Sequence, residues 1–140
     1  MTPEPLYEET NVENIPQVEA IVLRIAQKFD LPKEQHGDIL VSVTEAVNNA
    51  MIHGNQNDES KCVRMQVFKR ETTLAVHVTD EGEGFDHASL PDPTAPENIC
   101  QPDGRGVFLI HQLCDKVAYK DHGRRVEMSF HLCPDKHHRQ

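Results

Sequence analysis

The sequence predicts an α+β fold in which helices pack on one face of a mixed, mostly antiparallel sheet. Two segments repeat apolar residues at helical spacing, and several others alternate apolar and polar residues as strands do. The elements follow one another as strand, two helices, two strands, helix and two strands, an order that favours a layer of helices on one sheet. The chain has 140 residues, which is the length of one domain. We therefore expect a single domain over 1–140 with its core at about 5–132.

The first three elements have local signals in the sequence. Residues 5–10 have the pattern of a short edge strand. A helix is expected from Asn14, because asparagine is a good helix cap and Pro16 suits the first turn. A second helix is expected over about 33–53, and Gly54 is well placed to end it.

The rest of the chain is predicted as two hairpins separated by a long loop and a third helix. The loop contains four prolines and has no hydrophobic periodicity. A loop of this length inside a compact domain is usually functional or disordered. The expected elements are strands at 61–69 and 72–79, the loop at 80–103, a helix at 104–116, and strands at 117–120 and 125–131.

The charge balance and the chain termini exclude several classes of protein. The 14 basic and 23 acidic residues give a net charge of −9, which argues against nucleic-acid binding, because nucleic-acid binders normally carry a basic stripe. No apolar run approaches the about 20 residues of a membrane span, and the polar, acidic N-terminus is unlike a signal peptide. We expect a cytoplasmic domain whose four cysteines are free thiols.

One face of the second predicted helix carries polar side chains that suit chemistry on a phosphate. Glu45, Asn49 and His53 recur at every fourth position and therefore share a face, which Asp38 and Ser42 extend. An asparagine oxygen is a hard neutral ligand suited to Mg²⁺, and a glutamate one turn away can accept a proton from an attacking hydroxyl or water. The histidine could reach a phosphate. The alternative is an ordinary solvated face of an amphipathic helix.

An acidic, glycine-containing turn follows the strand at 72–79. Gly82 and Gly84 allow unusual backbone angles and close approach by a flat ligand. Asp80, just before them, can accept a hydrogen bond from an amino group such as that of adenine. The turn does not match an EF-hand, because no acidic residue stands at the twelfth position.

A second glycine-containing segment opens the third predicted helix. Gly104 and Gly106 leave backbone N–H groups exposed at the helix N-terminus, where the helix dipole favours an anion. Arg105 between them adds a positive charge suited to phosphate oxygens. A plain loop-to-helix junction would have the same composition.

Together, and in this order, the three segments resemble the motifs of the GHKL ATPase superfamily, also called the Bergerat or histidine-kinase-like ATPase fold. Residues 45–54 resemble its N box, 80–84 its G1 box and 104–110 its G2 box, and the proline-rich stretch before the last resembles its ATP lid. The resemblance is greatest to the anti-sigma factor serine/threonine-protein kinases of bacteria, which are short, stand-alone domains. It implies a two-layer α/β sandwich.

The resemblance also implies a role for each site residue. Glu45 would be the catalytic general base, Asn49 would hold Mg²⁺ against the ATP phosphates, and Asp80 would contact the adenine amine. The cofactors implied are ATP and Mg²⁺. The residues implied to bind ATP are Asn49, His53, Asp80, Gly82, Gly84, Gly104, Arg105, Gly106, Val107 and Phe108.

The function implied by the resemblance is that of an ATP-dependent protein serine kinase and anti-sigma factor. Such kinases phosphorylate a STAS-type anti-sigma factor antagonist and sequester a sigma factor, often as homodimers, without contacting nucleic acid or membrane themselves. The alternative is a nucleotide-gated regulatory binding module with little or no kinase activity. It is favoured by the first helix, which has no basic residue before Arg24, whereas some of these kinases carry an arginine near its start.

A third possibility is a relative of the sensor histidine kinases. These enzymes need a phosphoacceptor histidine on a helical hairpin. His36 is the candidate by position, but it lacks the expected His-Glu-Leu-Arg context.

Overall fold

A computed structural model describes residues 6–56, 58, 60–82, 109–121 and 123–132. In this part of the chain, five strands form one sheet in the order β1-β2-β3-β5-β4. All four strand pairings are antiparallel, so the sheet is antiparallel throughout and not mixed. The strands are β1 (Leu6–Val12), β2 (Val63–Arg70), β3 (Thr73–Thr79), β4 (Lys116–Lys120) and β5 (Arg125–His131).

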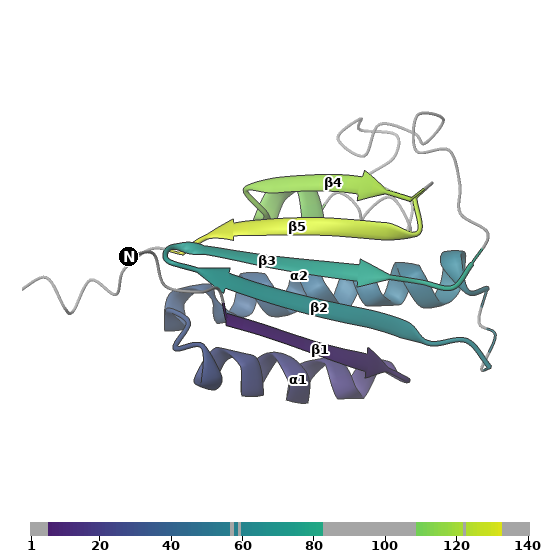
Figure 1. Ribbon diagram of the computed structural model, residues 1–140, viewed down its shortest axis with the longest axis horizontal. Coiled ribbons are helices and arrows are strands. Elements are labelled where there is room, and N and C mark those ends of the chain that lie inside the picture. Colours follow the sequence, from purple (N-terminus) through teal and green to yellow (C-terminus); the bar gives the residue numbers. More distant parts are fainter. Residues whose placement is uncertain (1–5, 57, 59, 83–108, 122, 133–140) are drawn as a thin grey trace, which may run out of the picture.

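The helices lie together on one side of this sheet, as Figure 1 shows, which confirms the predicted α+β architecture. The face turned toward them is apolar, and β2 illustrates the alternation: Val63, Met65 and Val67 are buried, whereas the side chains between them are not. None of the helices in the described part of the chain has both the length and the apolar character needed to cross a membrane. The helices are α1 (Ile15–Lys28), the 3-10 turn η1 (Lys33–Gln35), α2 (His36–Asn49), the π-helical turn η2 (Ala50–Gly54) and a short helix at 109–113.

The start of α1 is the one that the sequence predicts. The Asn14 side-chain oxygen accepts a hydrogen bond from the Gln17 backbone N–H at 3.1 Å, and Pro16 lies in the first turn. One face of the helix then packs into the core. The buried side chains of this face are Val18, Ile21, Val22, Ile25 and Ala26.

Two predicted boundaries are wrong, and each has a physical reason. The third helix ends near residue 113 and not at 116, because the Asp115 backbone N–H already pairs with the carbonyl of Ser129 in β5 at 2.9 Å. The chain therefore enters β4 at Lys116. The second helix is not continuous over 33–53, since it begins as the 3-10 turn η1, with Gln35 N–H donating to the Pro32 carbonyl at 3.1 Å, and it ends in the π-helical turn η2.

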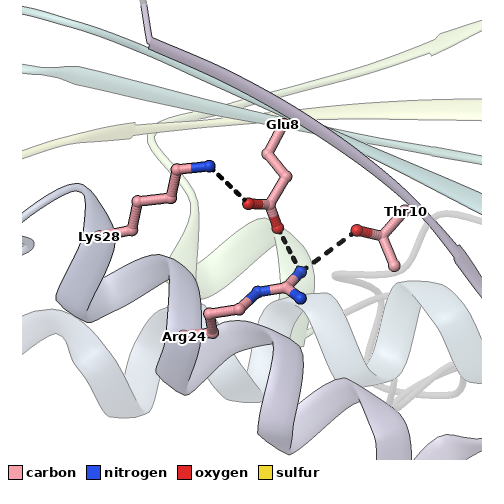
Figure 2. Close-up of polar contacts among 4 residues, drawn as sticks. All are labelled: Glu8, Thr10, Arg24 and Lys28. Atoms are coloured by element: carbon pink, nitrogen blue, oxygen red, sulfur yellow. Dashed lines mark hydrogen bonds and ion pairs between the residues drawn. The ribbon is translucent and has the colours of Figure 1, made fainter.

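A charged cluster fastens the edge strand β1 to α1 (Figure 2). Lys28 Nζ lies 3.0 Å from one carboxylate oxygen of Glu8, and Arg24 pairs with the other oxygen while also reaching Thr10 Oγ1 at 3.3 Å. Burial raises the pKa of Glu8, but the Lys28 hydrogen bond and the Arg24 charge outweigh it, so the pKa lies below its usual value. The carboxylate of Glu8 therefore stabilises the fold while it is ionised.

We expect Glu8→Gln to lower the free energy of unfolding by about 0.2–1 kcal/mol at pH 7, the usual range for exposed ion pairs. Because the pKa of Glu8 is lower in the folded state, its contribution is full above the unfolded value of 4.5 and disappears as the pH falls through the folded value. Urea unfolding at pH 7 and near pH 3 measures the loss of stability and its dependence on pH. Glu19→Gln, at an exposed position on α1, the helix whose Arg24 and Lys28 pair with Glu8, is the control. An equal loss at both pH values would contradict the ionic origin.

Candidate functional site

The polar face of α2 carries two of the predicted site residues one turn apart. Glu45 and Asn49 are both half-buried, so each keeps part of its side chain at the surface. Asp38, further toward the N-terminus, is exposed. Ser42 is fully buried, so the prediction that it extends the open face is wrong. The buried Ser42 therefore interrupts the accessible face between Asp38 and Glu45.

Cys114 is the neighbour of the buried Ser42 hydroxyl. Burial raises the pKa of the Cys114 thiol to about 11, against a smaller lowering by Ser42. A thiol with such a pKa is protonated at neutral pH and is a poor nucleophile. Cys114 thus helps to cover α2 and is not a candidate catalytic group.

The last turn of the second helix is wider than an α-helical turn. Residues 50–54 form the π-helical turn η2, and the Asn55 backbone N–H closes it by donating to the Ala50 carbonyl at 2.8 Å. The four-residue repeat therefore holds strictly only for Glu45 and Asn49, while His53 lies on the widened turn and is exposed. π-helical turns are frequent at functional sites because they redirect side chains without ending the helix.

The widened turn meets the acidic turn that follows β3. Figure 1 shows that α2 and β3 end at the same end of the domain. A Cβ atom added to Gly54 would lie 2.2 Å from the Asp80 carboxylate, and one added to Gly82 would lie 1.9 Å from the Gly54 carbonyl oxygen. Two of the predicted segments thus interlock through Gly54, Asp80 and Gly82, and both glycines are required by the space available.

The carboxylate of Asp80 is buried, since the residue is only 7% exposed. Its Oδ1 accepts a hydrogen bond from the Gly82 backbone N–H at 2.8 Å, and its own backbone N–H donates to the Arg124 carbonyl at 2.9 Å. Burial raises the pKa of Asp80, against the lowering effect of the Gly82 hydrogen bond. A buried acid with a raised pKa beside two required glycines is typical of a binding site.

Asn55 is a residue of this region that the sequence did not indicate. It lies within a run of polar residues that has the composition of a surface loop, yet it is only 3% exposed. Its side-chain nitrogen donates to the Cys62 carbonyl at 3.1 Å, and its side-chain oxygen accepts from the Glu81 backbone N–H at 2.8 Å. The signal that could have found it is its position directly after the helix-ending Gly54.

The structure places only some of the predicted nucleotide-binding residues. Asn49, His53, Asp80 and Gly82 lie on or beside the end of the second helix, and Glu45 lies one turn before Asn49. The remaining predicted residues lie outside the described part of the chain. They are Gly84, Gly104, Arg105, Gly106, Val107 and Phe108.

Comparisons with known proteins identify the family to which the chain belongs. Residues 9–130 match the family model described as the histidine kinase-like ATPase domain. The chain is 28% identical over 116 residues to an anti-sigma F factor of Clostridium botulinum, which covers 78% of this chain and 79% of that protein. It is 32% identical over 111 residues to an anti-sigma F factor of Clostridium perfringens, with 74% and 77% covered.

A serine-protein kinase is among the relatives as well. The serine-protein kinase RsbW of Oceanobacillus iheyensis is 27% identical over 118 residues, which cover 79% of this chain and 75% of that protein. The family match spans most of the chain, including the helix with Glu45 and Asn49 and the turn with Asp80. The chain therefore belongs to the histidine kinase-like ATPase family, in which it is related to bacterial anti-sigma factors and serine-protein kinases.

Proposed function

We propose that this protein is an ATP-dependent serine kinase that phosphorylates a STAS-type anti-sigma factor antagonist and sequesters a sigma factor. The observation that carries the proposal is the contact between Gly54, Asp80 and Gly82, which puts a buried carboxylate at the end of the helix that holds Glu45 and Asn49. The names of the relatives, anti-sigma F factor and serine-protein kinase, support the partners and the activity. We place the protein in the cytoplasm, with a homodimer as its assembly.

In this proposal, Asp80 recognises the adenine base. Its carboxylate accepts a hydrogen bond from the exocyclic amino group of the base, while Gly82, which has no side chain, lets the turn pack directly against the Gly54 carbonyl beside that carboxylate. Gly84 would line the same pocket. The Gly82 N–H holds one carboxylate oxygen in place, so the acceptor is oriented before the nucleotide arrives.

In this proposal, the polar face of the second helix and the segment at 104–108 bind the phosphates. The half-buried Asn49 offers a neutral amide oxygen, which suits Mg²⁺ because this ion keeps several waters and needs few protein ligands. Bound there, the ion would neutralise phosphate charge. The exposed His53 could reach a phosphate oxygen, and Gly104, Arg105, Gly106, Val107 and Phe108 would supply backbone N–H groups and one guanidinium.

The transfer step requires a base, and Glu45 is the candidate. Glu45 takes the proton of the attacking serine hydroxyl, the serine oxygen forms a bond to the γ-phosphorus, and the bond to the bridging oxygen breaks to release ADP. Glu45 lies one turn before Asn49 on the same face, so it can approach the γ-phosphate that the Asn49-bound ion would orient.

The test of the proposed function is phosphotransfer with the full chain. The protein is incubated with Mg-ATP and a STAS-type protein, and phosphoserine on that protein is measured by mass spectrometry, with ATP affinity measured by calorimetry. Stoichiometric phosphoserine together with a stable sigma-factor complex supports the proposal. Failure to bind any adenine nucleotide would overturn it.

A second candidate function is a nucleotide-gated binding module with little or no catalysis. Residues 15–23 at the start of α1 contain no lysine or arginine, and Arg24, the first basic residue of the helix, is already paired with Glu8. ATP binding and a stable partner complex without phosphoserine would favour this function.

We expect Asp80→Asn to weaken ATP binding about 10- to 100-fold, because a hydrogen bond to a charged acceptor contributes about 1.5–3 kcal/mol. The same substitution should leave the nucleotide-free protein at least as stable at pH 7, since burial disfavours the carboxylate charge. Calorimetry and thermal unfolding measure the two effects.

The pH dependence of Asp80 follows from the sign of its shift. The pKa of Asp80 in the folded state lies above the unfolded value of 3.8, so the folded state binds the proton more tightly. The free energy of unfolding therefore decreases as the pH rises through the window between these two pKa values. The stability gain of Asp80→Asn should therefore shrink as the pH falls toward 3.8. ATP affinity of the original chain should fall over the same window relative to the variant. A variant that binds ATP as tightly as the original chain would exclude the assigned role of Asp80.

A further inference from the structure

We propose that Asn55 is a positioning residue, whose side-chain amide fixes the Asp80–Gly82 turn against the end of the second helix and thereby sets the affinity for adenine. The inference rests on the proposed nucleotide-binding function. It adds a residue from outside the three motif segments, because Asn55 lies in the connection that leads from η2 to β2.

The amide of Asn55 is buried and both of its ends are used. The Glu81 N–H can only donate and the Cys62 carbonyl can only accept, so these two partners fix which end of the amide faces which segment. A short side chain with one donor and one acceptor is required here. Alanine would leave both partners unpaired in a part-buried place, which is costly.

A third hydrogen bond closes these contacts into a ring. The Cys62 backbone N–H donates to the Glu81 carboxylate at 2.8 Å, while Asn55 links the Cys62 carbonyl to the Glu81 N–H. The ring therefore ties the start of β2 and the turn after β3 to one residue. We call these three residues, Asn55, Cys62 and Glu81, the Asn55 ring.

The Asn55 ring acts on the peptide that carries the carboxylate. The Glu81 N–H belongs to the peptide bond that follows Asp80, so holding it fixes the direction in which the Asp80 side chain leaves the backbone. Asn55 itself is fixed by its own backbone, which closes the π-helical turn and directly follows Gly54, the residue against which Asp80 packs. The widened turn and the amide together decide where the carboxylate lies.

This placement matters because the carboxylate has almost no spare room. Asp80 is wedged between the required glycines at 54 and 82, and a displacement of about 1 Å is enough to misalign a binding group with its ligand. Loss of the Asn55 ring should therefore act on the nucleotide through Asp80 and not directly.

A double-mutant cycle with Asp80 tests the inference. ATP affinity is measured by calorimetry for the full chain, Asn55→Ala, Asp80→Asn and the double variant, with thermal unfolding to verify that each is folded. We expect Asn55→Ala to weaken ATP binding about 10-fold in the original chain and less than 2-fold in the Asp80→Asn background. Equal losses in both backgrounds would show a merely structural role and would overturn the inference.

Two further variants keep the test decisive. Ser60→Ala is the matched control, because it removes a hydrogen bond to Asp58 in the same connection without touching the Asn55 ring, and it should change ATP affinity less than 2-fold. If Asn55→Ala does not fold, Glu81→Ala breaks the ring at an exposed residue, and it should weaken ATP binding about 2- to 5-fold with the same dependence on Asp80. Unchanged affinity in a folded Asn55→Ala or Glu81→Ala variant would refute the inference alone. An original chain that binds no ATP would refute the proposed function together with it.

Discussion

If Glu45 is the base of the proposed kinase, Glu45→Gln is expected to reduce phosphotransfer to the proposed STAS-type substrate by about 100- to 10,000-fold, the usual contribution of a general base. Glutamine has the shape of glutamate but cannot take the proton of the serine hydroxyl. ATP affinity should stay within about 3-fold, because the proposed contacts to the base and to the phosphates come from other residues. Single-turnover transfer to a STAS-type protein and calorimetry with ATP measure the two quantities.

Asp38→Asn is the matched control for this substitution. It removes a carboxylate from the same helix about two turns earlier, where the side chain is exposed. A fall in transfer for both variants would indicate a general charge effect of the helix face. Full transfer by Glu45→Gln would exclude Glu45 as the base, and the polar face would then serve binding alone.

The fold was predictable from the sequence because its elements are defined by local signals. The cap at Asn14 and the alternating apolar residues of β2 each act over a few residues, so the pattern is visible without knowing what packs against it. Of the two wrong predictions, the end of the third helix depends on a distant partner. The third helix ends early because Asp115 pairs with Ser129 in β5, a contact that no local pattern contains.

The site was predictable only as far as its motifs reach. Glu45, Asn49 and Asp80 are candidates by their types and spacing, and the structure places Asp80 at the end of the helix that carries the other two. The burial of Ser42 was predicted wrongly and that of Asn55 was not predicted, because segments far along the chain decide both. Cys114 lies against Ser42, and Cys62 and Glu81 form hydrogen bonds with the Asn55 side chain.

The interlocked glycines lead to the most severe expected defect in nucleotide binding. We expect Gly82→Ala to weaken ATP binding by at least about 100-fold, because the new methyl group would lie 1.9 Å from the Gly54 carbonyl oxygen. A backbone oxygen at the end of a helix cannot move aside as a side chain can, so the turn that carries Asp80 must shift. The variant should also be less stable, by about 1–3 kcal/mol, which is typical of overpacking. Calorimetry with ATP and urea unfolding measure both.

Gly54→Ala and Gly37→Ala separate the cause of this defect from a general cost of replacing glycine. At Gly54 the new methyl group would displace the Asp80 carboxylate and crowd its Cβ, which would lie 2.8 Å away. Because the atoms met there belong to a side chain and not to a helix-end carbonyl, we expect a loss of ATP affinity with a smaller loss of stability than for Gly82→Ala. At Gly37, on α2, nothing lies within 4 Å of an added Cβ, and alanine should stabilise the helix by about 0.5–1 kcal/mol without changing ATP affinity. If Gly82→Ala bound ATP within about 3-fold of the original chain, the acidic turn would not form the adenine pocket. An affinity loss that is largest for Gly82→Ala, smaller for Gly54→Ala and absent for Gly37→Ala would instead tie nucleotide binding to the contact between the helix end and Asp80.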